Sequence, residues 1–226
     1  MRPRGEVGAV LFDLFGTLLD LAGLIAPCDL AAPGRGAELA AAWRRQQLEI
    51  SWLRTAMRSF VDFEHVTRDA LDGAVEELGL ELAAPARDDL LPAFERLPVA
   101  AGAVETLEDL RRQGIATGVL TNASRATLNR VLPRTRLDRL VDHALSVEAV
   151  ACFKPDPAVY RLAAEASGLE PARIGFVTAN GWDAAGASAF GLETAWLRAD
   201  ARMRLPRVGA PEPSIATWQS VADLFR

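Results

Sequence analysis

The sequence predicts an α/β fold, with a doubly wound, Rossmann-like parallel-sheet core and an inserted all-helical cap. From residue 98 onward, short apolar runs alternate with helical patterns, and such repeats are typical of a parallel sheet with helices on both faces. Before that, one apolar run near the N-terminus is followed by a long helical stretch. We therefore expect an α/β core of residues 1–17 and 98–226 and a helical cap subdomain of residues 18–97.

The first strand and the cap helices can be placed from local pattern. Val7–Phe12 is a short apolar run that ends at an acid and a glycine turn, as a buried strand does. Apolar residues then recur at helical spacing from about Gly36 to Met57. Two more helices are expected, near 64–78 and 87–96.

The second half of the chain alternates between the two kinds of element. Glycine and proline separate the segments, and Gly114 stands where a helix would end. Helices are expected over 101–113, 124–132, 156–167 and 182–190, and strands over 115–120, 143–146, 174–178 and 193–197.

Composition excludes several classes of partner. The 226 residues carry a net charge of -5 without a basic run, which argues against nucleic acid. No uncharged apolar stretch approaches the roughly 18 residues that a membrane span requires, so no membrane partner is expected. Cys28 and Cys152 are distant and form no C-x-x-C pair, which fits a reducing, cytoplasmic location.

Four short polar clusters follow the predicted core strands. They are D-L-F-G-T at 13–17, T-N at 121–122, K-P-D at 154–156 and T-A-N-G-W-D at 178–183. Each cluster alone is ordinary turn or capping chemistry. Because the carboxyl ends of parallel strands lie at one edge of a sheet, we expect all four to converge on a ligand site there.

Lys154 is the only lysine in the chain, and every other basic residue is an arginine. A lysine ammonium is compact and rotatable, whereas a guanidinium is a rigid fork that stays charged. Lys154 therefore marks a position where arginine does not serve. We expect it to make compact contacts with two candidate acids, Asp13 and Asp183.

The four clusters resemble the motifs of the haloacid dehalogenase superfamily, and within it those of the L-2-haloacid dehalogenases. The matching segments are F-D-L-F-G-T-L, L-T-N, F-K-P-D-P-x-V-Y and F-V-T-A-N-G-W-D, and P-G-R-G-A-E-L-A-A-A-W-R-R-Q-Q-L-E-I-S-W-L-R is similar to the first cap helices. The resemblance spans nearly the whole chain. It implies hydrolysis of short-chain L-2-haloacids to D-2-hydroxyacids, with inversion, by a homodimer that needs neither metal nor organic cofactor.

The resemblance also implies roles for individual residues. Asp13 would be the nucleophile that forms an ester, and Arg44, helped by Asn122, would receive the departing halide. Asp183, paired with Lys154, would activate the water that hydrolyses the ester. The substrate carboxylate would be bound by Thr121, Lys154 and the main-chain amides of Leu14 and Phe15.

Further residues would support these groups. Thr17, Thr178 and Asn180 would hold the acids by hydrogen bonds, and Tyr160 would flank the Lys154–Asp183 pair. The apolar pocket would be walled by Leu48, Phe63 and Trp182, for which plain core packing is the alternative interpretation.

Two alternatives remain: a phosphatase of the same superfamily and a catalytically silent binding protein on this fold. Phe15 occupies the position, two residues after the nucleophile, where the superfamily places a general acid. Magnesium prefers several hard oxygen ligands, and Asp13 and Asp183 alone make a poor set. Phosphoryl transfer is therefore disfavoured.

The chain departs from the dehalogenase pattern at four positions. Phe15 replaces a common tyrosine, Thr121 and Thr178 replace serines, and Arg45 replaces a glutamine. We expect Arg45 to lie on the solvated cap surface. The departures bear on substrate size and rate rather than on the reaction.

Overall fold

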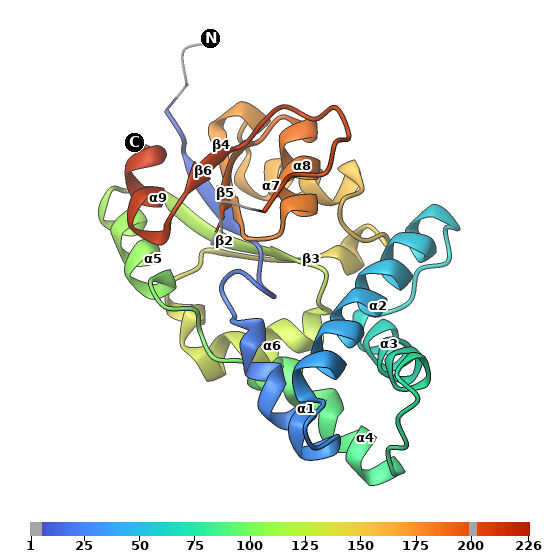
Figure 1. Cartoon of the computed structure of the whole chain (residues 1–226). Helices are drawn as coiled ribbons and strands as arrows, with labels where there is room; N and C mark the ends of the chain where they lie inside the picture. Colours follow the sequence, from blue (N-terminus) through green and yellow to red (C-terminus); the bar gives the residue numbers. More distant parts are fainter. Residues whose placement is uncertain (1–5, 199–202) are drawn as a thin grey trace.

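Six parallel strands form one sheet, in the order β3-β2-β1-β4-β5-β6, within residues 6–198 and 203–226, which the computed structural model describes (Figure 1). The predicted doubly wound α/β class is confirmed. The chain runs outward from central β1 to β2 and β3, then returns to the other side of β1 for β4 to β6. The strands are β1 (Ala9–Phe12), β2 (Ala116–Thr121), β3 (His143–Ser146), β4 (Ile174–Thr178), β5 (Glu193–Leu197) and β6 (Ser214–Ala216).

Helices cover both faces of this sheet. The helices α5 and α6 lie on one face and α7 and α8 on the other, while α9 packs beside α5 (Figure 1). Among the described helices, none has both the length and the apolar composition needed to cross a membrane. The core helices are α5 (Ala103–Arg112), α6 (Arg125–Thr135), α7 (Pro157–Ser167), α8 (Gly181–Phe190) and α9 (Trp218–Leu224).

Four further helices lie between β1 and α5 and group together away from the sheet (Figure 1). They are α1 (Ile25–Ala31), α2 (Gly36–Ala56), α3 (Phe63–Glu77) and α4 (Ala84–Leu90). The helix expected over 87–96 is wrong as a single element, because α4 gives way to a 3-10 segment, Leu91–Arg96. Pro92 explains the change, since proline lacks the amide that would continue α4.

The helical insertion leaves and rejoins the core at one place. The amide of Ala100 donates to the carbonyl of Leu18, and the amide of Asp20 donates to the carbonyl of Pro98, both at 2.9 Å. Leu19 and Val99 accordingly form an antiparallel bridge. The two connecting segments are thus held side by side next to the loop that follows β1.

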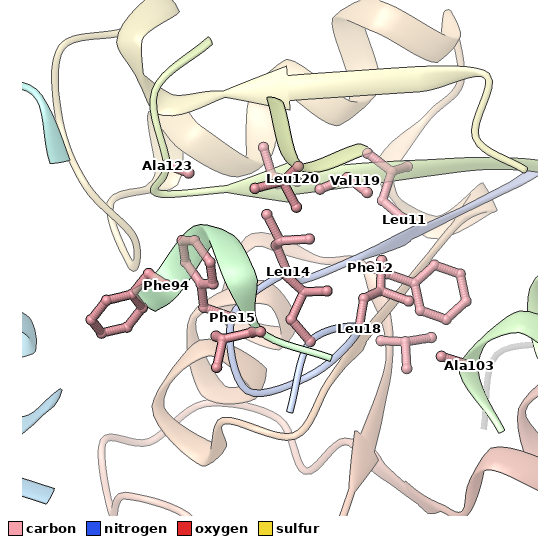
Figure 2. Close-up of a cluster of buried hydrophobic side chains, with 14 of the residues drawn as sticks. Leu11, Phe12, Leu14, Phe15, Leu18, Phe94, Ala103, Val119, Leu120 and Ala123 are labelled. Carbon is pink, nitrogen blue, oxygen red and sulfur yellow. The ribbon is translucent and has the colours of Figure 1, made fainter. Parts of the chain in front are cut away.

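A continuous apolar core joins the sheet to the insertion. All residues of β1 are buried, as expected for a central strand covered on both faces. Figure 2 shows Leu14 and Phe15 continuing this buried row beyond the strand. Phe94, from the insertion, packs edge-on against Phe15 with ring centroids 5.4 Å apart. The loop after β1 is therefore fixed by packing from both parts of the molecule.

Gly186 in α8 and Gly73 in α3 are helical glycines with opposite surroundings. A Cβ at Gly186 would lie 2.5 Å from the Tyr160 hydroxyl, whereas at Gly73 the nearest atom is 3.4 Å away. We expect Gly186→Ala to lower the free energy of unfolding by about 1–3 kcal/mol through overpacking. Gly73→Ala should raise it by about 0.5–1 kcal/mol, because alanine is the better helix former. Chemical denaturation of both variants tests this, and equal effects would contradict it.

Candidate active site

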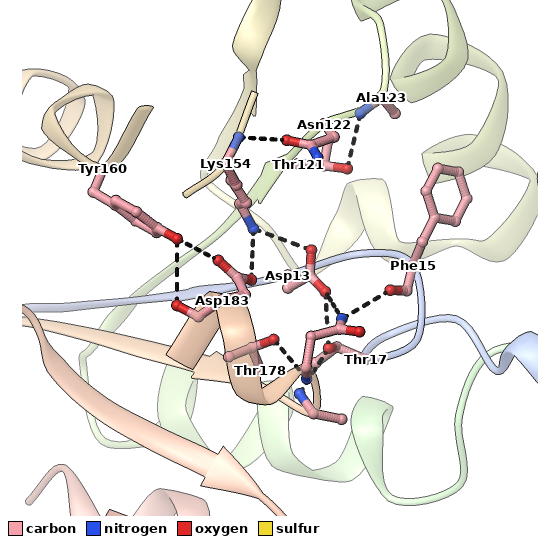
Figure 3. A network of polar contacts seen from close by, with 12 residues as sticks. Asp13, Phe15, Thr17, Thr121, Asn122, Ala123, Lys154, Tyr160, Thr178 and Asp183 are labelled. Atoms are coloured by element: carbon pink, nitrogen blue, oxygen red, sulfur yellow. Dashed lines mark hydrogen bonds and ion pairs between the residues drawn. The ribbon is translucent and has the colours of Figure 1, made fainter. Parts of the chain in front are cut away.

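The four polar clusters meet at the carboxyl edge of the sheet, as Figure 3 shows. Asp13 directly follows β1, and Thr121 ends β2 with Asn122 after it. Lys154 comes three residues before α7, and Asp183 lies in the first turn of α8. Since β1 lies between β2 and β4 in the sheet, these loops are neighbours in space. Residues separated by as many as 170 positions therefore form one polar cluster.

Lys154 joins the two acids. Its Nζ donates to Asp13 Oδ1 at 3.1 Å and to Asp183 Oδ2 at 2.9 Å. Lys154 and Asp183 are fully buried, and Asp13 is 5% exposed. The Tyr160 hydroxyl donates to Asp183 Oδ1 at 2.7 Å. One ammonium thus lies between two carboxylates in a site with little water access.

The second oxygen of Asp13 receives two donors. Thr17 Oγ1 donates to Oδ2 at 3.1 Å, and Asn180 Nδ2 donates to it at 2.7 Å. The amide of Ala179 donates to Thr17 Oγ1 at 3.0 Å, which leaves the Thr17 proton for Asp13. Thr178 Oγ1 accepts the amide of Asn180 at 3.1 Å and so positions that side chain. Among the described residues, Oδ1 has a single donor, Lys154, and so keeps a lone pair free.

Burial and charge set the protonation of this cluster. Burial raises the pKa of Asp183 to about 6, against the lowering effect of Lys154, and the nearby Asp13 charge also raises it. Burial, followed by the Asp183 charge, raises the pKa of Tyr160 well above its usual value. Tyr160 therefore remains a proton donor to Asp183 at neutral pH, while Asp183 titrates close to neutrality.

Several donors next to Asp13 have no protein acceptor. Within residues 6–198 and 203–226, the amides of Leu14 and Phe15 form no hydrogen bond. Thr121 Oγ1 accepts the amide of Ala123 at 3.1 Å, so its proton is free to be donated elsewhere. Asn122 Oδ1 accepts the amide of Lys154 at 3.0 Å, which leaves its NH2 group as a donor. These groups can bind an anion beside Asp13.

Arg44 reaches this edge from α2 of the insertion. Its Nη2 lies 3.5 Å from the carbonyl oxygen of Phe15, and its Nη1 donates to Gln47 Oε1 at 2.6 Å. Its Nε is enclosed and has no hydrogen-bond partner in the described part of the chain. Burial lowers the pKa of Arg44, and the charges of Asp13 and Asp183 oppose that effect. Gln47 was not predicted as a site residue, although its spacing of three residues from Arg44 places both on one helix face.

The three predicted wall residues have different surroundings. Phe63 is buried and stacks on Phe15 with ring centroids 6.1 Å apart. Trp182 is half-buried and meets Trp52 of α2 edge-on at 5.7 Å. Leu48 is half-buried one turn after Arg44. Phe63 therefore lies against Phe15, and these two side chains line one part of a cavity of about 250 Å³.

Arg45 points away from this cluster. It pairs with Glu77 and lies 3.7 Å from Glu49, and its side chain is 46% exposed. Its place on the solvated surface agrees with the expectation from sequence. In the part of the chain that the structure describes, no group of three or more His, Cys, Asp or Glu side chains is arranged to hold a metal ion.

A family model of haloacid dehalogenase-like hydrolases matches residues 7–191. The chain belongs to this family. An (S)-2-haloacid dehalogenase of Pseudomonas sp. (strain YL) is 38% identical to this hydrolase over 219 residues, which are 97% of this chain and 94% of that protein. An (S)-2-haloacid dehalogenase of Pseudomonas putida is 35% identical over 192 residues, 85% of each chain.

Solved structures extend the likeness to the fold of this hydrolase. The L-2-haloacid dehalogenase from Xanthobacter autotrophicus with chloropropionic acid covalently bound has a TM-score of 0.90 and 30% identity. The match covers 96% of this chain and 98% of that one. The family membership inferred from the four motifs is thus confirmed.

The variant Lys154→Met would leave Asp13 and Asp183 buried without their cation. We expect it to lower the free energy of unfolding by about 3–5 kcal/mol at about pH 8. Without the ammonium, the folded-state pKa of Asp183 rises further above its usual value, so the folded protein binds more protons than the unfolded chain. Stability then increases as the pH falls, and the loss should shrink towards about pH 5.

Urea denaturation at both pH values measures this difference. Arg112→Met is the control, because Arg112 pairs with Asp109 on the surface with 75% of its side chain exposed, and such a pair contributes little. A loss for Lys154→Met that is the same at both pH values would contradict the ion-pair explanation.

Proposed function

We propose that this hydrolase dehalogenates short-chain L-2-haloacids to D-2-hydroxyacids through an ester on Asp13. The observation that carries the proposal is the asymmetric environment of the Asp13 carboxylate. Oδ1 has one donor and a free lone pair, whereas Oδ2 is held by Thr17 and Asn180. The 38% sequence identity with an (S)-2-haloacid dehalogenase, over 97% of this chain, supports the same reaction.

In the first step, Asp13 Oδ1 attacks the carbon that bears the halogen from the face opposite the carbon–halogen bond. A new C–O bond forms as the C–halogen bond breaks, and the halide leaves with the electron pair, so the configuration is inverted. Halide needs no proton to leave, which is consistent with a phenylalanine at position 15. The carboxylate is held in place by Lys154, so the attack requires little reorganisation.

The leaving halide and the substrate carboxylate each need donors. Arg44, with its unpartnered Nε, and the free NH2 group of Asn122 would stabilise the charge that develops on the halide. The unpaired amides of Leu14 and Phe15 would bind the carboxylate, together with the Thr121 hydroxyl and the remaining proton of Lys154.

In the second step, water attacks the ester carbon, Cγ of Asp13. Oδ2, now the carbonyl oxygen, takes up negative charge and is stabilised by the two donors already bound to it, Thr17 and Asn180. Asp183 accepts the proton of the attacking water. The Cγ–Oδ1 bond then breaks, and Oδ1 leaves as the hydroxyl of the product after taking the proton that Asp183 accepted, while the re-formed Asp13 carboxyl releases its own proton to solvent. The water oxygen remains in Asp13.

The insertion would complete the pocket. We take residues 18–97 as a cap and residues 1–17 and 98–226 as the catalytic core, since the two connecting segments pair at Leu19 and Val99. Phe63 would form one pocket wall, and Leu48 and Trp182 would form others. The exposed apolar side chains of Leu53, on α2, and of Met57, directly after α2, support a homodimer. The unpaired thiols support a cytoplasmic location.

Incubation with L-2-chloropropanoate and a chelator tests the proposed reaction, with free chloride and D-lactate as the expected products. A single turnover in heavy-oxygen water should place the label in the Asp13 carboxylate and leave the product unlabelled. Mass spectrometry of the protein and of the product distinguishes the two. Label found only in the product would rule out the ester, and no halide from any short 2-haloacid would refute the activity.

The pKa of Asp183 predicts the pH dependence of ester hydrolysis. Because a protonated carboxyl cannot accept a proton from water, the hydrolysis rate should fall as the pH drops below about 6. Tyr160→Phe removes a hydrogen bond that lowers this pKa, so the fall should begin at higher pH.

The variant Asp183→Asn lacks the group that accepts the proton of water, so it should release one halide per site and accumulate the ester. Rapid-quench measurement of adduct mass checks this, and an unshifted profile for Tyr160→Phe would contradict the assignment.

A further inference from the structure

We propose that Gln47 is a positioning residue for Arg44, and that its neutrality keeps the charge of Arg44 available to the leaving halide. The proposal rests on the function proposed above and adds a residue to it. Gln47 is polar yet completely buried in the insertion, where an unpaired amide would be costly. Its side chain lies between Arg44 and α3, so its hydrogen bonds determine what it does.

The neighbours of Gln47 define the orientation of its amide. Arg44 Nη1 can only donate, so the atom 2.6 Å from it must be the oxygen, Oε1. On the other side, Thr67 Oγ1 donates to the carbonyl of Phe63 at 2.7 Å and therefore accepts from Gln47 Nε2, also at 2.7 Å. In each of these three hydrogen bonds a donor faces an acceptor. The Gln47 amide therefore has one orientation in which its contacts with Arg44 and Thr67 are both made, and that orientation fixes one edge of the guanidinium.

The rest of the guanidinium is left for a ligand. Its contact with the Phe15 carbonyl is long, at 3.5 Å, and Nε has no partner in the described chain although it is enclosed. The short contact of Nη1 with Gln47 is therefore the main anchor of Arg44, and it sets where the remaining N–H groups point. Because the Thr67 hydroxyl donates to the Phe63 carbonyl, the same series of hydrogen bonds connects the Arg44 guanidinium to Phe63, the proposed pocket wall.

The anchor carries no charge, unlike the partners of other arginines in the insertion. Arg45 pairs with Glu77, Arg54 with Asp69 and Arg87 with Asp72. Among the described residues, no carboxylate lies within salt-bridge distance of Arg44. A glutamate at position 47 would keep the contact but neutralise the cation at 2.6 Å and compete with the halide for it. A glutamine supplies the position without that competition.

The test variant is Gln47→Glu, measured in two single-turnover steps with L-2-chloropropanoate. We expect halide release to slow by about 100-fold, the order of effect seen when one transition-state donor is lost. Hydrolysis of the preformed ester should proceed at the wild-type rate, since Arg44 has no part in it. Chloride, the poorer leaving group, should be affected more than bromide, so the bromide-to-chloride rate ratio should rise.

Two controls separate positioning from folding and from added charge. Gln46→Glu adds the same charge at the adjacent position, where the side chain faces Glu77, and should leave both steps near the wild-type rate. Thr67→Val removes the acceptor of Gln47 Nε2 and should slow halide release alone, whereas Thr67→Ser keeps the hydroxyl and should restore it. The two Thr67 variants test the hydrogen-bonded series from Arg44 through Gln47 to Thr67 even if Gln47→Glu does not fold.

The outcomes are distinct. A wild-type protein that releases no halide overturns both the proposed function and this inference. A wild-type protein that is active, with unchanged halide release in Gln47→Glu or in folded Thr67→Val, overturns the inference alone. Equal slowing of halide release and ester hydrolysis would also overturn it, because that pattern indicates a general structural role.

Discussion

The contact of one ammonium with two buried carboxylates is the interaction on which the site depends. Two carboxylates buried this close together would repel each other, and each would have lost its hydration. Lys154 offsets both costs through a single atom, at 3.1 Å from Asp13 and 2.9 Å from Asp183. A guanidinium spreads its donors over a planar fork and would need a wider gap. The space between the loops after β1 and β4 therefore suits lysine.

The two carboxylate oxygens of Asp13 accept hydrogen bonds from different kinds of donor. Neutral donors, Thr17 and Asn180, hold Oδ2, while the charged Lys154 holds Oδ1. Neutral donors can serve the carboxylate before attack and the oxyanion after it, without a permanent charge that would trap either state. Arg44 is also held by a neutral group, because its hydrogen-bond partner in the insertion is the side-chain amide of Gln47. In the proposed reaction, charge would thus be concentrated in the groups that meet the reacting atoms.

Much of this arrangement could be predicted from sequence because local pattern and sheet topology agree. Strand ends place Asp13 and Asp183 at one edge, and the scarcity of lysine drew attention to Lys154. The short strand β6 and the helices α1 and α9 were missed, since each is too short for periodicity to identify. Gln47 was missed for another reason. From the sequence, Gln47 would be taken for a solvent-exposed polar residue of α2. It is buried because α2 packs against α3.

Phe15 departs from the tyrosine that the family pattern leads one to expect, and its contacts show which part of this residue makes the polar interactions. Its side chain packs between Phe63 and Phe94, away from hydrogen-bond partners. The polar contacts of this residue are made by its main chain. Its carbonyl oxygen accepts a hydrogen bond from Asn180 at 3.2 Å and lies 3.5 Å from Arg44. A main-chain oxygen is present whatever the side chain is. The identity of residue 15 therefore sets the shape of the adjoining 250 Å³ cavity, while the link between core and insertion is preserved.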